Sequence, residues 1–399
     1  MKVVLVSTFE QHGGAAIACN RLMHALRLVG VDARMLVLYK TSQDNYVDEV
    51  SSSSLKKRFN LFVERLGIFV KNGFNRCDLF ALSTATTGFN LSLHPWVKEA
   101  DVINLHWVNQ GLMSIKDIEN LVHKHQKVVW TMHDMWPITG LCHHATNCTS
   151  YQYGVCESCK PYHYTASSRC IDTSRIKLVG VSRWLCDKAE LSYKQLESTV
   201  IGNVIDCEHF KPESFDKITT QKELWKVPID KKVIAMGAAD LSTPLKGIEL
   251  LVKALKSLPN VADYHLLLFG NVSKDKALFF EQLPVDFTYL GVVDYNTLPL
   301  IYNVADLVVV PSYYETFGQT ISEAMACECP VVAFDSGGQK DIIDHKQTGY
   351  LARAWEPNDL AHGINWVLFE LEDAIIIGKK ARRTILERFS SQVIAQKYI

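Results

Sequence analysis

The sequence contains no apolar run long enough to cross a membrane, since a bilayer-spanning helix needs about 20 such residues. Its first stretch, MKVVLVSTFEQHGG, has a short apolar run and no small-residue cleavage site, which does not match a signal peptide. We therefore expect this stretch to form a first β-strand. Without an export signal, scattered thiols stay reduced, so we expect a cytoplasmic protein.

The sequence also lacks common phosphate-binding fingerprints. It contains neither a P-loop signature nor a complete G-x-G-x-x-G, and it has no internal repeat. There is no overall basic excess either, since 42 Lys and Arg stand against 43 Asp and Glu. Residues 1–205 have 22 Lys and Arg against 17 Asp and Glu, and segment 55–76 alone has six basic residues and one Glu. Such a local patch argues against nucleic-acid binding by the whole domain.

What the sequence does contain is a regular alternation of short β-branched runs with helical patterns. The runs include KVVLVS (2–7), DVINLHW (101–107), KVVWTMH (127–133) and DLVVVPS (306–312). Near-continuous apolar strands separated by helices predict parallel sheets covered on both faces. We therefore expect an α/β protein with two doubly wound Rossmann-like domains.

A polar stretch with two prolines, at residues 205–230, precedes a fresh strand and is the best candidate for a domain boundary. We expect an N-terminal domain at 1–205 with a Cys-rich loop at 142–159. A C-terminal domain should follow at 206–375. We expect a last helix, at 376–399, to pack back on the first domain.

In open α/β sheets, ligands bind outside the carboxyl ends of the strands, so residues that follow strands are the candidates. Gly13 and Gly14 follow the first strand and open a helix, which suits either a tight turn or a phosphate or substrate loop. His106 and His133 each end a strand. A lone His is usually structural, but two at parallel strand ends favour a ligand role, with His133 the better candidate.

The second half of the chain offers a cation and two carboxylates. Lys246 stands at a helix start, where a bound phosphate would offset the unfavourable helix dipole. Glu315 and Glu323 stand eight residues apart in YYETFGQTISEAMA. One interpretation is structural, because Thr320-x-x-Glu323 is a capping-box pattern. The other is that both carboxylates accept hydroxyl hydrogen bonds from a sugar nucleotide, with backbone amides facing its phosphates at Phe317, Gly318 and Gln319.

Four of the 11 cysteines cluster with the spacing C-x5-C-x7-C-x2-C. They are Cys142, Cys148, Cys156 and Cys159. Four thiolates at this spacing could hold one structural zinc ion in a tetrahedral site. The alternatives are a loop of free thiols, or disulfides if the protein meets an oxidant.

Segment 55–76, LKKRFNLFVERLGIFVKNGFNR, repeats apolar residues at helical spacing with Lys and Arg between them. This pattern is typical of an interfacial amphipathic helix that is attracted to anionic lipid. The alternative is a helix that packs its apolar face on its own domain. Membrane contact would suit a lipid-linked substrate and would place the protein at the inner face of the cytoplasmic membrane.

Residues 288–350 resemble the donor site of retaining glycosyltransferases of family 4, which have the GT-B fold. The resembling run is TYLGVV…LPLIYNVADLVVVPSYYETFGQTISEAMACECPVVAFDSGGQKDII…TGYL, with a Glu-x7-Glu core. Looser similarity extends over nearly the whole chain, and the TMHDMWPITGLCHHA stretch resembles the colanic-acid or capsule-type branch. The resemblance implies two Rossmann-like domains that face each other across a cleft.

The resemblance also implies a role for each candidate residue. Glu323 would bind the nucleotide ribose, and Glu315 would contact hydroxyls of the donor sugar. Lys246 would neutralise the diphosphate, and His133 would lie beside the donor sugar. No catalytic metal would be required, because cations and helix N-termini stabilise the leaving diphosphate. The remaining residues under or around the donor would be Gly13, Gly14, Phe317, Gly318, Gln319 and Thr320.

Two positions depart from the family pattern. The family usually has an Arg in G-R-x-…-K-G, where this chain has Gly237-Ala238-Ala239. It also usually has a glycine between EAMA and the PVV strand, where this chain has Cys327-Glu328-Cys329. The first departure removes one phosphate cation, so donor binding would be weaker or an Arg would come from elsewhere.

The sequence therefore predicts a retaining glycosyltransferase that moves a sugar from a UDP- or GDP-sugar to a glycan acceptor. The acceptor would be lipid-linked, and the setting would be surface-polysaccharide assembly. One alternative is a non-catalytic nucleotide-sugar sensor or scaffold. Another is an epimerase or phosphorylase on the same fold.

Overall fold

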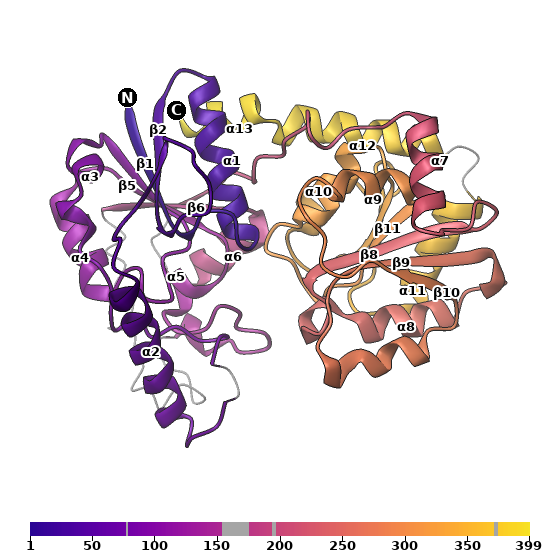
Figure 1. Cartoon of the computed structure of the whole chain (residues 1–399), viewed down its shortest axis with the longest axis horizontal. Coiled ribbons are helices and arrows are strands. Elements are labelled where there is room, and N and C mark those ends of the chain that lie inside the picture. The colour runs from indigo at the N-terminus through magenta and orange to yellow at the C-terminus, as the bar shows by residue number, and fades with distance from the viewer. Residues whose placement is uncertain (77–78, 154–174, 194–196, 371–373) are drawn as a thin grey trace. The chain divides into compact units, whose positions relative to one another are not determined.

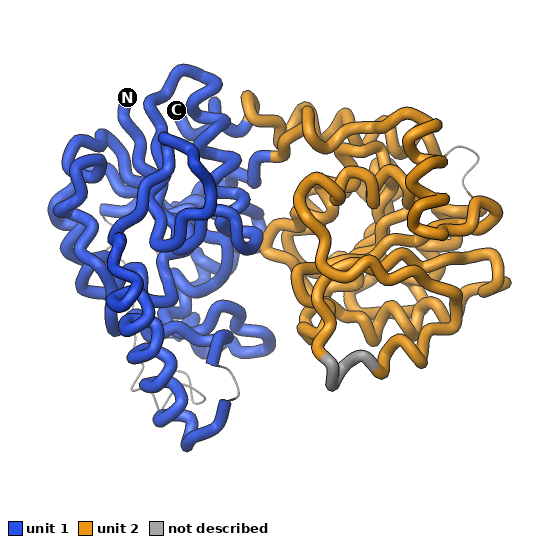
Figure 2. Tube along the Cα trace, in the orientation of Figure 1, with its two compact units in different colours: residues 1–204, 394–399 blue, residues 205–393 orange. Residues whose placement is uncertain are grey.

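The chain forms two compact units, which are coloured separately in Figure 2. The first contains Met1–Val204 together with Ile394–Ile399, and the second contains Ile205–Val393. Segment 376–399 is therefore divided between the two units. The computed structural model describes residues 1–76, 79–153, 175–193, 197–370 and 374–399.

The first unit is built on a seven-stranded sheet with the order β3-β2-β1-β4-β5-β6-β7. Every pairing in it is parallel. The order reverses between β1 and β4, since β2 and β3 continue on one side and β5 to β7 on the other. The strands are β1 (Lys2–Phe9), β2 (Asp32–Tyr39), β3 (Val47–Glu49), β4 (Val102–Leu105), β5 (Val128–Met132), β6 (Ile176–Gly180) and β7 (Ser198–Val200).

The second unit repeats this plan with a six-stranded parallel sheet, ordered β10-β9-β8-β11-β12-β13. Here the order reverses between β8 and β11. The structure thus confirms the predicted α/β fold with two doubly wound Rossmann-like domains. The strands are β8 (Lys232–Asp240), β9 (Tyr264–Asn271), β10 (Asp286–Tyr289), β11 (Leu307–Val310), β12 (Val331–Phe334) and β13 (Tyr350–Ala352).

Strands β11 and β12 of the second sheet are apolar along their whole length because helices cover both faces of the sheet. All four residues of β11 and all four of β12 are buried. In the second unit, α8 and α11 lie on one face of the sheet and α9, α10 and α12 on the other (Figure 1). The helices of the first unit are α1 (Gly14–Leu28), α2 (Ser54–Lys71), α3 (Pro95–Glu99), α4 (Ile115–Lys124), α5 (Trp136–Thr139) and α6 (Arg183–Ser192).

The C-terminal helices are shared between the two units. Helix α12 packs on α10, while the end of α13 belongs to the first unit. There, the hydroxyl groups of Tyr398 and Thr131 lie 3.0 Å apart at the end of β5. The helices from residue 205 onward are α7 (Phe215–Leu224), α8 (Ile248–Lys256), α9 (Leu298–Val304), α10 (Gln319–Ala326), α11 (Pro357–Asn365), α12 (Ala374–Phe389) and α13 (Ser391–Tyr398).

None of the helices in the described ranges combines the length and the apolar character that crossing a bilayer requires.

Arg382 of α12 connects three parts of the second unit through backbone carbonyls. Its Nη1 donates to the carbonyls of Phe210, at 3.1 Å, and Ala326, and its Nη2 donates to that of Cys207 at 3.4 Å. The Ala326 carbonyl lies at the end of α10, where the helix itself supplies no donor. One guanidinium therefore joins α12 to α10 and to the chain that enters the unit.

We expect Arg382→Met to lower the free energy of unfolding of the second unit by about 2 kcal/mol, because buried acceptors lose a charged donor. The neighbouring Arg383→Met is the matched control, since Arg383 is exposed and pairs with Glu387 on the next helical turn. Calorimetry of the full chain measures both variants. Equal melting temperatures for the two would contradict this role for Arg382.

Candidate functional site

The reversal of strand order in the second sheet brings two loops together, the position where doubly wound folds bind ligands. Lys246 ends a short 3-10 helix (Pro244–Lys246) that follows β8, and Glu315 lies in the loop that follows β11. Lys246 Nζ donates to Glu315 Oε1 at 2.7 Å, and Ser312 Oγ donates to the same oxygen at 2.8 Å. The two predicted residues are therefore in direct contact.

Backbone contacts hold these two loops next to each other. The amide of Tyr313 donates to the carbonyl of Leu245 at 2.9 Å. Gly247, with φ of 65°, lies against the loop after β11, and a Cβ on it would stand 2.0 Å from the Pro311 carbonyl oxygen. A glycine is therefore required beside Lys246, both for its backbone angle and for its lack of a side chain.

A third loop, which follows β12, packs against the backbone of Glu315 and hydrogen-bonds to it. The amide of Gly338 donates to the Glu315 carbonyl at 2.8 Å. A Cβ on Gly337 would lie 2.6 Å from the same carbonyl oxygen, so this approach also depends on a glycine. The pair Gly337-Gly338 and the hydroxyl of Ser312 are site elements that our reasoning from the residues missed. The double glycine directly after a strand was the available signal.

Helix α10 begins differently from our expectation. Its N-cap is Gly318, with φ of 111° and no side-chain cap, so the predicted Thr320–Glu323 capping box is wrong. The left-handed glycine starts the helix two residues before Thr320, which places Glu323 in the second turn. Glu323 is buried and accepts a hydrogen bond from the Tyr302 hydroxyl at 3.1 Å.

The side chains around the N-terminus of α10 do not all face the same way. Phe317 is 2% exposed and packs edge-to-face on Phe389 with ring centroids 5.4 Å apart. Its ring is therefore part of the core, and only its backbone is available to a ligand. Gln319 and Thr320 are half-buried in the first turn of the helix.

At the first departure, a Cβ on Gly237, the glycine that the family pattern shares, would lie 2.1 Å from the ring of Phe269. Nothing in the structure explains Ala238 at the position where the family has an Arg. At the other departure, Glu328 has φ of 63°, a left-handed angle that strains any residue except glycine. A charged side chain thus stands where a glycine would be unstrained.

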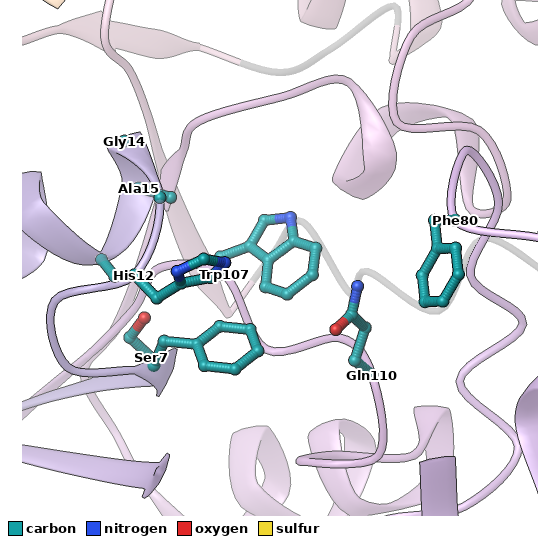
Figure 3. A pocket seen from close by; sticks show the side chains of 10 residues that line it. Ser7, His12, Gly14, Ala15, Phe80, Trp107 and Gln110 are labelled. Atoms are coloured by element: carbon teal, nitrogen blue, oxygen red, sulfur yellow. The ribbon is translucent and has the colours of Figure 1, made fainter. Parts of the chain in front are cut away.

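The first sheet has a pocket of about 440 Å³ at its own reversal of strand order, between the loops that follow β1 and β4. The rings of Phe9 and Trp107 stack with centroids 6.3 Å apart, and His12 meets Phe9 edge-on at 5.4 Å. Phe80 and Gln110 lie on the side opposite His12 (Figure 3). The lining residues are Ser7, Phe9, His12, Gly13, Gly14, Ala15, Ala16, Phe80, Trp107 and Gln110.

Gly13 and Gly14 form one wall of this pocket at the start of α1. Gly13 is the N-cap residue and has φ of 86°, which favours glycine. The first turn of α1 contains no acidic residue, so the partial positive charge of the helix N-terminus is not offset within that turn. The loop therefore combines amide donors with the aromatic rings of the pocket.

His106 and His133 follow two neighbouring strands, β4 and β5. His106 Nδ1 and His133 Nε2 lie 2.8 Å apart, and the rings stack with centroids 5.1 Å apart. Burial lowers the pKa of His133 to about 4, against the opposing effect of Asp134. Burial, and then the neighbouring His133, hold the pKa of His106 well below its usual range. Both rings are therefore neutral at physiological pH.

The buried Nε2 of His106 determines the tautomers of the His106–His133 pair. His106 Nε2 is buried and has no hydrogen-bond partner among the described residues. A bare lone pair there costs less than an unpaired N–H, so the proton of His106 belongs on Nδ1, from which it donates to His133 Nε2. His133 then keeps its own proton on Nδ1. The dyad thus fixes which nitrogen of His133 donates to a ligand.

Asp134 organises the loop after β5. Its Oδ2 accepts from Trp107 Nε1 at 2.8 Å and contacts His143 Nδ1 at 2.6 Å, and its Oδ1 accepts from the Trp136 amide at 2.9 Å. Burial alone would raise the pKa of Asp134, but the His143 ring, then His144 and the Trp136 amide, outweigh it and lower the pKa. Asp134 thereby fixes Trp107, which lines the pocket.

Ser83, His143 and Asp134 have the connectivity of a nucleophilic triad, since Ser83 Oγ lies 2.9 Å from His143 Nε2. Ser83 is fully buried, so a substrate has no access to its hydroxyl. The arrangement therefore stabilises the loop and does not supply a nucleophile.

The predicted zinc site lies only partly within the described residues. Cys156 and Cys159 fall outside them, while Cys142 and Cys148 pack beside Leu141 and Leu82. Where the structure is described, no three His, Cys, Asp or Glu side chains converge in a way that could hold a metal ion. The zinc site stays a prediction.

Comparison with known proteins agrees with the geometry of the second unit. Residues 219–384 match the family model described as "Glycosyl transferases group 1". An uncharacterized glycosyltransferase of Methanocaldococcus jannaschii is 30% identical over 46% of this chain and 47% of its own length. A D-inositol 3-phosphate glycosyltransferase of Mycobacteroides abscessus is 34% identical over 41% of this chain and 37% of its own length. The chain thus spans half or less of the length of these curated relatives.

Similarity to solved structures extends over both units. The Anabaena protein HepE, in complex with UDP and glucose, aligns with 100% of this chain and 98% of its own, with 17% identity and a TM-score of 0.67. The chain therefore has the GT-B fold, and its segment 219–384 matches the model of the group 1 glycosyl transferases.

Proposed function

We propose that this protein is a glycosyltransferase that moves a sugar from a nucleotide-sugar donor to a glycan acceptor with retention of anomeric configuration. The supporting observation is the contact between Lys246 and Glu315 at the strand-order reversal of the second sheet. This contact lies inside the segment that matches the group 1 family model. A structural neighbour that binds UDP and glucose supports a UDP-sugar as donor, with a GDP-sugar as the alternative.

In this proposal the second unit binds the donor. Lys246 and the backbone amides at the start of α10, those of Phe317, Gly318, Gln319 and Thr320, face the diphosphate. Glu315 accepts hydrogen bonds from hydroxyls of the sugar. Glu323, held by Tyr302, accepts them from the ribose. The ammonium group of Lys246 is already positioned by its contact with Glu315. Binding of the donor therefore costs little further side-chain entropy at Lys246.

The chemical step is a substitution at the anomeric carbon. The bond to the diphosphate oxygen breaks, and a bond to the acceptor oxygen forms on the same face of the sugar. The proton of the acceptor hydroxyl passes to the leaving phosphate. Lys246 and the N-terminus of α10 stabilise the charge of the leaving diphosphate, so the proposed reaction requires no catalytic metal.

The first unit contributes the acceptor side. Aromatic rings such as Phe9 and Trp107 suit the apolar faces of a glycan, and Ser7 and Gln110 supply hydrogen-bonding groups in the same pocket. Neutral His133, with its Nδ1 proton fixed by His106, together with Gly13 and Gly14, contacts the reacting sugar. We propose a lipid-linked acceptor, a cytoplasmic location at the inner face of the membrane, and a role in surface-polysaccharide assembly.

A nucleotide-sugar sensor or scaffold is the second candidate. The observation that favours it is Ala238, at the position where the family usually has a phosphate-binding Arg. Thermal shifts with UDP-, GDP- and CMP-sugars identify the donor, because a ligand that binds only the folded state raises its stability. Slow donor hydrolysis then supports the enzyme. Binding without turnover on any acceptor supports the sensor, and turnover that needs no acceptor supports an epimerase or phosphorylase.

We expect Lys246→Met to weaken binding of the identified nucleotide sugar about tenfold to a hundredfold, because a charge-assisted contact to phosphate is lost. Isothermal titration calorimetry measures the affinity. Lys253→Met is the matched control, because Lys253 is an exposed lysine on the adjoining helix α8. Equal affinities for the two variants would remove Lys246 from the donor site.

We expect His133→Ala to reduce turnover about a hundredfold while changing donor affinity much less, as for a group that donates a hydrogen bond at the reaction centre. Steady-state kinetics separate the two effects. The control is His123→Ala, an exposed histidine on α4. Unchanged turnover in His133→Ala would refute a role at the reaction centre.

Protein purified without added zinc should contain about one zinc ion per chain if the four cysteines form a structural site. Elemental analysis measures the content, and Cys142→Ser combined with Cys148→Ser should abolish it. Cys186→Ser is the control, since Cys186 is buried on α6 and lies outside the cluster. A wild-type protein without zinc would exclude the site.

A further inference from the structure

Helix α2 has an inverted distribution of side chains. Its buried residues are Lys57, Asn60, Glu64 and Ile68, three of which are polar. Five of its large apolar side chains point to solvent and are 44–78% exposed. These five residues, which we call the α2 apolar stripe, are Leu55, Phe59, Phe62, Leu66 and Val70.

Polar contacts attach the inner side of α2 to the first unit. Lys57 Nζ lies 3.0 Å from Glu49 Oε1, and Asn60 Nδ2 donates to the Gly111 carbonyl at 3.2 Å. Glu64 Oε1 accepts from the backbone amides of Thr84 and Ala85 at 2.9 Å and 3.2 Å. These contacts pair Lys57 Nζ, Asn60 Nδ2 and Glu64 Oε1, while Glu64 Oε2 lies 3.5 Å from Arg65 Nη2. The helix is therefore held without the apolar stripe.

The stripe is continuous along the helix. Successive residues of an α-helix are separated by about 100°, so the five positions fall within an arc of about 80°. The buried positions 57, 60, 64 and 68 are centred on the opposite side. Two further exposed rings, Phe74 and Phe80, follow the helix at 70% and 65% exposure. Figure 1 shows α2 at the edge of the first unit. Large apolar patches of this kind usually mark an interaction surface.

The charges beside the stripe have one sign. Lys56 and Arg58 are exposed on either side of it, and Lys71 and Arg76 are exposed near its C-terminal end. The acidic residue of segment 55–76 is Glu64, which is 1% exposed and faces inward. Every exposed charge in this segment is therefore positive.

We propose that α2 lies on the surface of an anionic lipid bilayer, with the apolar stripe inserted among the acyl chains and the flanking basic side chains at the phosphate headgroups. An anionic bilayer accounts for both the exposed apolar stripe and the positive charges beside it. A second copy packed stripe to stripe would bring the same positive charges together, because a two-fold interface pairs identical surfaces. The proposal does not depend on the glycosyltransferase assignment, since it concerns a different part of the first unit.

Vesicle flotation of the full chain tests the proposal. The protein should float with vesicles of phosphatidylcholine mixed with phosphatidylglycerol, and binding should weaken as salt is added. Vesicles of phosphatidylcholine alone should bind much less. Phe59→Ser with Phe62→Ser should weaken binding by at least about tenfold, through lost apolar burial. Lys56→Gln with Arg58→Gln should weaken it about 25-fold, at about fivefold for each basic residue near the surface.

Matched variants elsewhere on the chain serve as controls. Phe215→Ser with Ile229→Ser removes two side chains that are 80% and 76% exposed, and Lys379→Gln with Lys380→Gln removes two exposed charges. Both should bind like the wild type. Circular dichroism and melting temperature verify folding, which we expect to persist because the replaced side chains point to solvent.

Three results would overturn the proposal. One is a wild-type protein that does not float with either kind of vesicle. Another is equal loss of binding in the α2 variants and the controls. The third is a concentration-dependent dimer, measured by light scattering, that Phe59→Ser with Phe62→Ser abolishes without any vesicle binding. Donor binding measured in solution with the same variants separates failure of this proposal from failure of the proposed function.

Discussion

The burial of both faces of two parallel sheets is the constraint on which the rest of the structure depends. Helices on each face leave little room for polar side chains in the middle of a strand, so the ones that can meet a ligand gather where strands end. His106 and His133 directly follow β4 and β5, while Lys246 and Glu315 lie in the loops after β8 and β11. The chemistry of each unit therefore concentrates where its strand order reverses.

These strand-end groups are held by neighbours and not by their own loops alone. Glu315 is fixed at its carboxylate by Lys246 and Ser312, and at its carbonyl by the amide of Gly338. Its contacts thus come from loops after three different strands. His133 is held in the same way by His106 from the adjacent strand. Such support positions polar groups before a ligand arrives, which lowers the entropic cost of binding.

The sequence was sufficient for features that depend on local pattern. Apolar runs alternating with helical segments predicted the two sheets, and residues directly after the runs proved to be neighbours. Features that depend on distant partners were not predictable. The left-handed angle of Gly318 displaced the expected cap at Thr320, and Phe389, some 70 residues away in the chain, draws the Phe317 ring into the core.

Helix α2 is the clearest case of a feature that depends on distant partners and could not be predicted from the sequence. Periodicity predicts that a helix has an apolar and a polar side, but it does not say which side faces the protein. That choice depends on Glu49, on the carbonyl of Gly111, and on the amides of Thr84 and Ala85, none of which lies within the helix. Because these groups bind the polar side chains on the inner side of α2, the apolar stripe can change without breaking the bonds that attach the helix. Its exposure is therefore a property of the surface, separable from the stability of the fold.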